Sequence, residues 1–284
     1  MQIAFLGGDR RMTLCADRAK REGHAVYAAV GGEGLLSHEV VTGVREASLL
    51  VLPYPATRDG VHITGTHIPF SVLPLREGAT VVGGAIPPDW HREHVLFYDV
   101  AKEETFLWRN ARLTAEGALA AAMTATERGL WGVETAVLGY GRIGAQLAHL
   151  LACLGAHVTV YARRPSVRAA AEAEGYGTAS LSFPLSLSER AVFNTLPPDV
   201  TPSVLLKKGA FCYDLGGGLP SALPDGEGGE VTVTCLRGVP GAFAPLAAAE
   251  VYYDALRPCL LGAGASESES FPEDGVVPTF AEGR

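Results

Sequence analysis

The chain has 284 residues, a formal net charge of -8 at pH 7 and a sequence pI near 5.5. It is longer than the size at which a single core usually stops growing, so two domains of about 100 to 150 residues each are expected. The acidic balance disfavours a general nucleic-acid surface, and an anionic ligand would need arginines placed locally. The apolar runs are shorter than the about 18 to 20 residues that a membrane span needs.

The N-terminal segment has the pattern of a βαβ unit. Residues 2–6 predict a strand, a turn at Gly7-Gly8-Asp9 follows, and a helix to about Glu22 leads to a second strand at 24–29. Further strands are expected in SLLVLP, at 79–82 and at 95–97. These elements predict a Rossmann-like substrate or catalytic domain over residues 1–108.

The second half begins with a helix and returns to alternation. ARLTAEGALAAAMTATERGL has apolar residues at helical spacing, which predicts a long linking helix in 109–130. A strand from Thr135, a glycine turn, a helix at 146–154 and a strand at 157–161 follow, and the alternation continues through AVFNTLPP and GAFCYDLGGG. This predicts a nucleotide-binding Rossmann domain over 131–240, with helices on both faces of a parallel sheet.

The C-terminal segment predicts a closing helix and a mobile tail. The helix is expected in 241–262 and should stop near Pro258, and residues 263–284 are polar and acidic. The predicted fold class is therefore α/β, with two Rossmann-like doubly wound domains, parallel sheets and a long helix between them.

Cysteines and histidines give no indication of a metal site. The five cysteines lack CxxC spacing and the eight histidines lack metal-ligand spacing, so no metal is expected. His62 and His67 are interpreted as incidental. The N-terminus lacks a basic segment and a cleavage site, and together with the unpaired thiols this predicts a cytoplasmic protein without a signal peptide.

Three glycines carry the main functional motif. Gly139, Gly141 and Gly144 form GxGxxG between a strand and a helix. In this frame the glycines serve a tight turn, close approach of a diphosphate, and helix-strand packing, while the helix N-terminus attracts the anion. The alternative is a degenerate domain that keeps its glycines for packing. The predicted cofactor-binding residues of this turn are Gly139, Tyr140, Gly141, Arg142, Ile143 and Gly144.

Two arginines indicate which dinucleotide binds. An NAD-selective site has an acidic residue after the second strand, but here the sequence reads YARRP, with Arg163 and Arg164. Guanidinium groups pair with a 2'-phosphate, so NADP is favoured over NAD. The alternative is that both arginines belong to a solvated loop.

Further strand ends contribute polar residues. AVFNTLP places Asn194, Thr195, Leu196 and Pro197 where such a sheet meets the nicotinamide side of the cofactor, and CYDLGGG places Asp214 at the next strand end. A simple loop explains Gly216 to Gly218 equally well. The turn with Asp9, Arg10 and Arg11 also ends a strand, and it either faces a ligand or is an ordinary charged turn.

The ordered series of motifs resembles a known family. IAFLGGDRR, VLPYPATRDG, NARLTAEGALAAA, VLGYGRIG, FNTLPP, YDLGGG and RGVPGAFAPLAAAE, in this order from residue 2 to about 262, resemble the A subunit of dipicolinate synthase. The sequence departs from the family after the fifth strand, where it reads DLGGGLPSALPDG. The resemblance implies NADP-dependent oxidation of a dihydrodipicolinate-type intermediate to pyridine-2,6-dicarboxylate, on a branch of the lysine/diaminopimelate pathway, in the mother cell of a sporulating bacterium.

The resemblance also implies a partner, the flavoprotein-like B subunit, and it allows a homo-oligomer. A substrate with two carboxylates needs arginine, hydroxyl or amide groups, and proton removal needs a base. Glu116 and Asp9 are the candidate bases, although Glu116 can instead be a first-turn helix acid. The substrate-binding candidates, expected to face a cleft between the domains, are Arg11, Thr57, Arg58, Asn110, Thr114 and Arg237.

Two other functions remain open. The chain can be a non-catalytic nucleotide-binding subunit of a synthase complex, or an oxidoreductase similar to alanine or 2-hydroxyacid dehydrogenases. A D-2-hydroxyacid dehydrogenase would need a histidine with a carboxylate partner late in the chain, and none occurs after His157.

Overall fold

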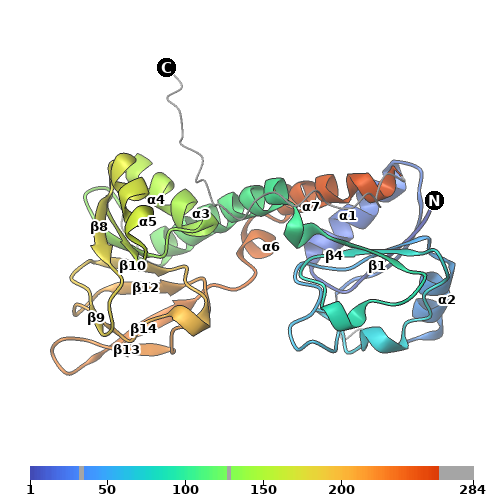
Figure 1. Ribbon diagram of the computed structural model, residues 1–284, viewed down its shortest axis with the longest axis horizontal. Helices are drawn as coiled ribbons and strands as arrows, with labels where there is room; N and C mark the ends of the chain where they lie inside the picture. Colours follow the sequence, from blue (N-terminus) through green and yellow to red (C-terminus); the bar gives the residue numbers. More distant parts are fainter. Residues whose placement is uncertain (32–34, 127–128, 262–284) are drawn as a thin grey trace, which may run out of the picture. The chain divides into compact units, whose positions relative to one another are not determined.

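The computed structural model describes residues 1–31, 35–126 and 129–261, which divide into two compact units (Figure 1). The first unit contains Met1–Asn110 together with the described residues from Pro240 onward, and the second contains Ala111–Val239. Helix α3 (Glu104–Thr126) carries the chain from one unit into the other. The tail at 263–284, predicted to be mobile, lies outside the described residues.

The first unit is built on a parallel sheet of five strands in the order β2-β1-β3-β4-β5. In register, Ile3 of β1 lies between Val26 of β2 and Leu49 of β3. This position between two neighbouring strands buries β1 from Ile3 to Leu6. The strands are β1 (Gln2–Leu6), β2 (Ala25–Ala29), β3 (Leu49–Val51), β4 (Thr80–Gly83) and β5 (Leu96–Asp99).

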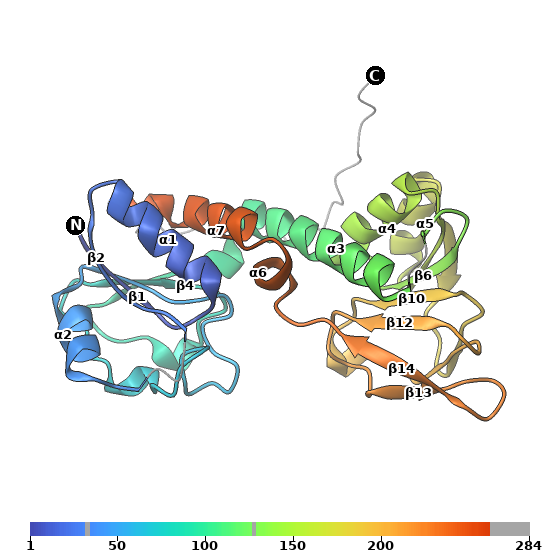
Figure 2. The ribbon, with the colours of Figure 1, turned by 180° about the vertical axis from the view of Figure 1, so that it is seen from behind.

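Helices cover both faces of this sheet. Helix α1 (Arg10–Arg21) lies beside α7 (Pro245–Leu260) on one face, where the Cys15 thiol donates to the Ala249 carbonyl over 3.4 Å (Figures 1 and 2). Helix α2 (His38–Glu46) packs Val40 and Val44 into the core of the other face. The expected α/β architecture is confirmed in this unit, and its strands and first helix lie within a few residues of their predicted ranges.

The helices that flank the units differ from their predicted ranges. Helix α3 begins at Glu104, earlier than expected, because Phe106 packs edge-on against Tyr54 and Tyr252, with ring centroids 5.2 and 5.8 Å away. The predicted closing helix is two helices, α6 (Val239–Phe243) and α7. The helix α7 ends at Leu260, close to the expected stop near Pro258.

The second unit contains a seven-stranded sheet in the order β13-β14-β12-β10-β6-β7-β8. Strand β6 lies between β7, the next strand in sequence, and the later strand β10. The strand order therefore reverses between β6 and β10, as in dinucleotide-binding sheets. Only β13 pairs antiparallel among the described strands of this sheet, at the edge seen in Figure 2. The strands are β6 (Glu134–Leu138), β7 (His157–Ala162), β8 (Gly177–Ser180), β10 (Ala191–Asn194), β12 (Phe211–Asp214), β13 (Ala222–Pro224) and β14 (Glu230–Cys235).

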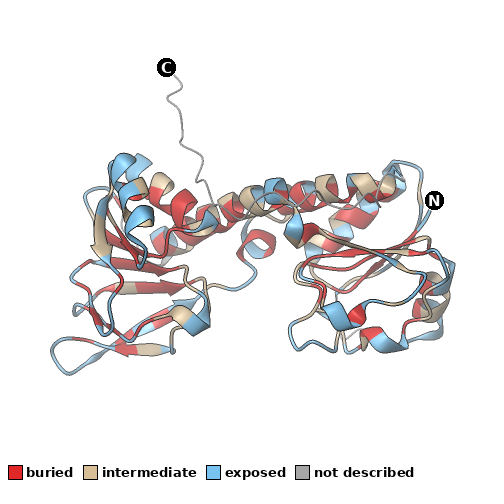
Figure 3. Cartoon of the chain, in the orientation of Figure 1, coloured by how far each residue is buried: buried red, intermediate tan, exposed pale blue. Residues whose placement is uncertain are grey.

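The two faces of this sheet are covered differently. On one face Val137 and Phe193 pack against α3, α4 (Arg142–Cys153) and α5 (Pro165–Ala173). On the other face Leu138 and Val192 meet extended segments that include β9 (Leu185–Ser186) and β11 (Val204–Leu205). The inner strands β6 and β10 are buried between these layers, apart from Glu134 at the start of β6 (Figure 3).

The expectation of helices on both faces is therefore not met in this unit. The described chain between α5 and α6 contains no α-helix, only short strands and the 3-10 turn η4 (Pro198–Val200). Prolines in these connections remove backbone donors and disfavour helices; there are six, Pro184, Pro197, Pro198, Pro202, Pro220 and Pro224. The segments instead run extended and bury leucines such as Leu185 and Leu206.

Candidate functional site

In the glycine turn after β6, two of the three glycines are closely packed against other atoms and the third borders open space. Gly139 has φ +92, and a Cβ there would lie 2.9 Å from both Thr195 Oγ1 and Leu196 Cδ2. A Cβ on Gly144 would clash with the carbonyl oxygen of Gly139. A Cβ on Gly141 would meet no heavy atom within 4 Å. Because Gly141 is open, close packing within the protein does not explain all three glycines.

The start of α4 suits an anionic group. Gly141 is the N-cap and provides no side-chain acceptor for the first-turn N–H groups, and both Gly141 and Arg142 are exposed. Helix α4 begins at this turn, four residues before the predicted start at Gln146. Uncapped N–H groups and the helix dipole attract a phosphate, and the missing side chain at Gly141 leaves room for it.

Tyr140 and Ile143 differ in what they offer to a ligand. Tyr140 is buried in the helical core edge-on to Tyr176, with ring centroids 6.2 Å apart, and burial raises the pKa of its hydroxyl. Its side chain therefore packs inward instead of lining the turn. Ile143 is partly exposed in the first turn of α4.

Arg163 and Arg164 follow β7 directly and are both exposed. Strand β7 lies beside β6, and the Gly139 N–H donates to the Tyr161 carbonyl over 2.9 Å. Both arginines therefore lie close to the glycine turn. Neither side chain forms an ion pair with another residue that the structure describes. Two exposed cations without an ion-pair partner thus lie at the end of the second strand, the position at which dinucleotide-binding Rossmann sheets generally hold the ribose.

A third arginine, which sequence reasoning missed, supports this turn. Arg168 Nη1 donates to the carbonyl oxygens of Ala162 at 2.8 Å and Arg163 at 2.9 Å. These bonds fix the backbone from which both exposed arginines project. In the sequence, Arg168 has no feature that distinguishes it from a surface arginine on a helix.

Asn194 and Asp214 hold two loops together. Both are almost fully buried, and Asn194 Nδ2 donates to Asp214 Oδ1 over 2.8 Å. Asp214 also accepts the N–H groups of Gly217 at 2.9 Å and Leu219 at 3.1 Å. These bonds position the loops after β10 and β12, and direct contact of these side chains with a cofactor stays a prediction.

The neighbouring loop residues also pack on the glycine turn. Thr195 Oγ1 donates to the Leu138 carbonyl over 2.9 Å, and Leu196 lies against Gly139, while Pro197 is exposed. A Cβ on Gly216 would clash with the Leu196 carbonyl. Close packing of these two loops therefore accounts for Gly216, as the simple-loop alternative expected.

In the first unit, Asp9 and Arg11 form a tight pair at the start of α1. Asp9 Oδ2 accepts from Arg11 Nη2 at 2.8 Å, and Asp9 Oδ1 accepts from Arg11 Nε at 2.9 Å. Burial raises the pKa of Asp9, but the hydrogen bonds and charge of Arg11, helped by the charge of Arg58, hold it below its usual value. A carboxylate held in this way is a weak proton acceptor, which does not favour Asp9 as the base.

Glu116 lies in the interior of α3, so the interpretation as a first-turn acid is wrong. The helix starts at Glu104, too far from Glu116 for the helix dipole to act there. Glu116 Oε1 accepts from Arg112 Nε over 2.8 Å, and Arg112 Nη1 donates to Gln146 Oε1 over 3.3 Å. Glu116 is therefore also tied to an arginine.

The substrate-binding candidates lie in both units. Thr57 and Arg58 are in the loop after β3, in the unit that also holds Arg11 and Asn110. Thr114, which is buried, and Arg237, which is exposed, belong to the second unit. That all six bind one ligand stays a prediction.

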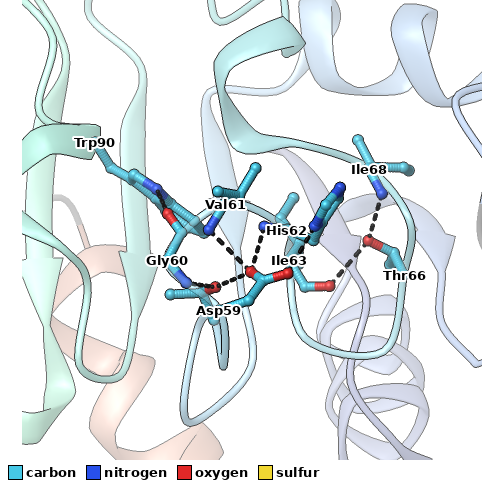
Figure 4. A network of polar contacts seen from close by, with 9 residues as sticks. Asp59, Gly60, Val61, His62, Ile63, Thr66, Ile68 and Trp90 are labelled. Carbon is cyan, nitrogen blue, oxygen red and sulfur yellow. Dashed lines mark hydrogen bonds and ion pairs between the residues drawn. The ribbon is translucent and has the colours of Figure 1, made fainter.

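The loop after β3 is strongly hydrogen-bonded (Figure 4). The Thr57 hydroxyl accepts the Gly60 N–H at 3.0 Å, and Trp90 Nε1 donates to the Gly60 carbonyl at 2.9 Å. The Gly8 N–H donates to the Thr64 carbonyl at 2.7 Å, so the loop covers the turn after β1. Arg10 is exposed beside this turn.

Metal and membrane features are absent within the described residues. No group of three or more His, Cys, Asp and Glu side chains there is suited to hold a metal ion. None of the helices in those same ranges combines the length and the apolar character needed to cross a membrane.

Comparison with known proteins places this chain among dehydrogenase folds. Residues 106–206 match the family of the NAD-binding domain of D-isomer specific 2-hydroxyacid dehydrogenases. The match includes the glycine turn, both exposed arginines and the loop after β10. A search of curated proteins finds no match.

Solved structures share the fold over nearly the whole chain. The dipicolinate synthase A chain from Bacillus subtilis has a TM-score of 0.66 at 19% identity, and the alignment covers 92% of this chain and 96% of that chain. The A subunit of dipicolinate synthase from Bacillus halodurans has a TM-score of 0.66 at 19% identity, covering 91% and 97%. The D-isomer specific 2-hydroxyacid dehydrogenase from Lactobacillus delbrueckii ssp. bulgaricus, in its NAD complexed form, has a TM-score of 0.53 at 13% identity, covering 94% and 99%.

These findings bear out the coarser predictions. The fold resembles that of the dipicolinate synthase A chain, as the motifs indicate. The matched domain and the dehydrogenase fold support an NAD(P)-dependent oxidoreductase with a nicotinamide cofactor.

Proposed function

We propose that this chain is the A subunit of a dipicolinate synthase, an NADP-dependent dehydrogenase that oxidises a dihydrodipicolinate-type intermediate to dipicolinate. The observation that carries the proposal is the open turn at Gly141 beside the exposed Arg163 and Arg164. The seven motifs in family order and the shared fold over nine-tenths of the chain support the choice of substrate.

The cofactor follows from the charges around the turn. Gly141 and the start of α4 would hold the diphosphate, and Arg163 and Arg164 would hold the 2'-phosphate of NADP. Arg168 would keep the arginine turn in place. No carboxylate stands at the end of β7 to favour the 2'-hydroxyl of NAD.

The chemistry requires orientation more than activation. When bound, the nicotinamide accepts the hydride that the ring loses. The product is aromatic, so the protein's main tasks are to hold two carboxylates, exclude water and accept one proton. If the true intermediate carries a 4-hydroxyl, the same proton-transfer group would assist the loss of water.

The biological setting is part of the proposal. The chain would act in the cytoplasm of the mother cell of a sporulating bacterium, on a branch of the lysine/diaminopimelate pathway. It would work with a flavoprotein-like B subunit.

The test is turnover by the purified chain. Substrate is generated enzymatically in the cuvette, and NADPH formation and dipicolinate are measured with and without the B subunit. Tight NADP binding without any turnover, even with the partner present, would indicate a non-catalytic subunit.

The family match of residues 106–206 favours a second candidate, a 2-hydroxyacid dehydrogenase, which should oxidise simple hydroxy acids such as D-lactate. The position of the last histidine, His157, argues against that candidate.

A further inference from the structure

A groove runs along the first unit between α1 and α7. The two helices lie side by side (Figure 2), and together with Arg109 of α3 they line an open cavity of about 620 Å³. All residues that line this cavity belong to the first unit. The groove is therefore separate from the glycine turn, which belongs to the second unit.

Contacts between the two helices fix their alignment. The Cys15 thiol donates to the Ala249 carbonyl, and further along Arg18 Nη1 lies 3.8 Å from Asp254 Oδ1. Later residues of α1 thus face later residues of α7, so the helices run in the same direction. The side chains along the groove consequently have a defined order.

Positive and negative charges along the groove are equal in number. The charged lining residues are Arg18, Arg21, Arg109, Glu22, Glu250 and Asp254. Most of them pair within the chain. Arg18 Nε lies 3.1 Å from Glu22 Oε1, and Arg109 Nη1 lies 2.9 Å from Asp254 Oδ2. Because the charges balance, the groove has no net attraction for a small anion or a small cation.

Two opposite charges in the groove lack an ion-pair partner among the described residues. Arg21 and Glu250 are both exposed, and Arg21 Nε donates only to the Asp17 carbonyl, over 3.4 Å. Ala249 faces Cys15, so Glu250 and Arg21 are displaced by about 9 Å along the helix axis, at about 1.5 Å per residue. This displacement explains why they do not pair with each other.

A second copy of the chain would supply both missing partners. In a dimer with two-fold symmetry, each surface meets the same surface of its copy. A two-fold axis can lie in the interface, midway between Arg21 and Glu250 and perpendicular to the line that joins them. It sets Arg21 opposite Glu250 of the second copy, and Glu250 opposite Arg21 of the second copy. One arrangement thus pairs four charges that are unpaired in the single chain.

Covering the groove would also bury apolar surface. Leu246 lines the groove with its side chain 63% exposed, and the half-buried Leu14 lies in the same lining. Removing these side chains from water favours association. An apolar floor with charges around it is the usual composition of a protein–protein interface.

We infer that the groove between α1 and α7 is the interface of a homodimer, in which Arg21 and Glu250 form two reciprocal ion pairs. The inference does not rest on the proposed function, because it concerns a surface of the unit that lacks the glycine turn.

The test measures the oligomeric state of the full chain by sedimentation velocity at concentrations from about 1 to about 100 µM. The wild type should reach twice the 29.8 kDa of one chain. Arg21→Glu sets two acidic side chains against each other at both pairs, and Glu250→Arg sets two arginines there. Each single variant should raise the dimer Kd at least about tenfold, since like charges across an interface repel.

Mixing the two variants gives the sharper result. In a dimer of one Arg21→Glu chain and one Glu250→Arg chain, both pairs again join opposite charges. An equimolar mixture should therefore form dimers at concentrations where each variant alone is monomeric. The matched controls are Arg45→Glu and Glu46→Arg, because both residues are exposed on α2, on the opposite face of the sheet. They should dimerise as the wild type does.

Each outcome supports or overturns the inference. A wild type that stays monomeric overturns it, and loss of B-subunit binding in the groove variants would then assign the groove to that partner. Single variants that dimerise as the wild type does, or a mixture that stays monomeric, also overturn it. If a charge-reversal variant fails to fold by circular dichroism, Arg21→Ala with Glu250→Ala is measured in its place and should weaken the dimer.

Discussion

The cofactor preference can be tested by removing Arg163 and Arg164 together. Both side chains are exposed at the end of β7 and pair with no described residue, so their replacement by alanine should leave the fold intact. Each charge-assisted hydrogen bond to a phosphate contributes about 1.5 to 3 kcal/mol, and exposure places these at the lower end. The pair should therefore contribute about 3 kcal/mol, which corresponds to roughly a 150-fold change in Kd.

The measurement is titration calorimetry of NADP and NAD with both proteins. NADP affinity should fall by about two orders of magnitude, while NAD affinity changes little, because NAD has no 2'-phosphate. The matched control is Lys207→Ala with Lys208→Ala, which removes two exposed cations near the amino end of β12, at the opposite edge of the same sheet. Equal losses for NADP and NAD in the arginine variant, or equal losses of NADP affinity in both double variants, would refute the assignment.

Four further predictions concern the glycine turn, the buried Asn194–Asp214 pair and the Asp9–Arg11 pair. Gly144→Ala should lower the free energy of unfolding, measured in urea, by about 1 to 3 kcal/mol, because its Cβ meets the Gly139 carbonyl. Gly141→Ala should keep wild-type stability in urea but weaken NADP binding. Asp214→Ala should cost at least about 2 kcal/mol in the same assay, since it leaves buried donors without an acceptor. The pKa of Asp9 is lowered in the fold, so its pair with Arg11 stabilises the protein fully above the unfolded carboxyl pKa of about 3.9 and less as pH falls below it. The difference in Tm between wild type and Asp9→Asn should therefore shrink below that pH. A difference in Tm that stays constant with pH would contradict the pairing.

Much of the nucleotide-binding unit could be predicted from local sequence. The GxGxxG spacing depends on steric rules that act within a few residues. In the structure a Cβ on Gly144 would clash with the Gly139 carbonyl, whereas one on Gly141 would meet open space. Strand positions in both units also follow from local apolar runs. The place of Arg163 and Arg164 directly after β7 could also be predicted, because the apolar run of that strand ends just before them.

Tertiary structure alone decided the partners of the polar side chains. Which charges neutralise Asp9 and Glu116, how Asn194 and Asp214 join two loops, and that Arg168 supports the arginine turn depend on distances that sequence separation does not reveal. The start of α3 likewise depends on aromatic packing around Phe106. Local patterns thus determined the elements and the glycine turn, whereas the pairing of Asp9 and Glu116 with arginines required the fold, because only the fold decides which side chains become neighbours.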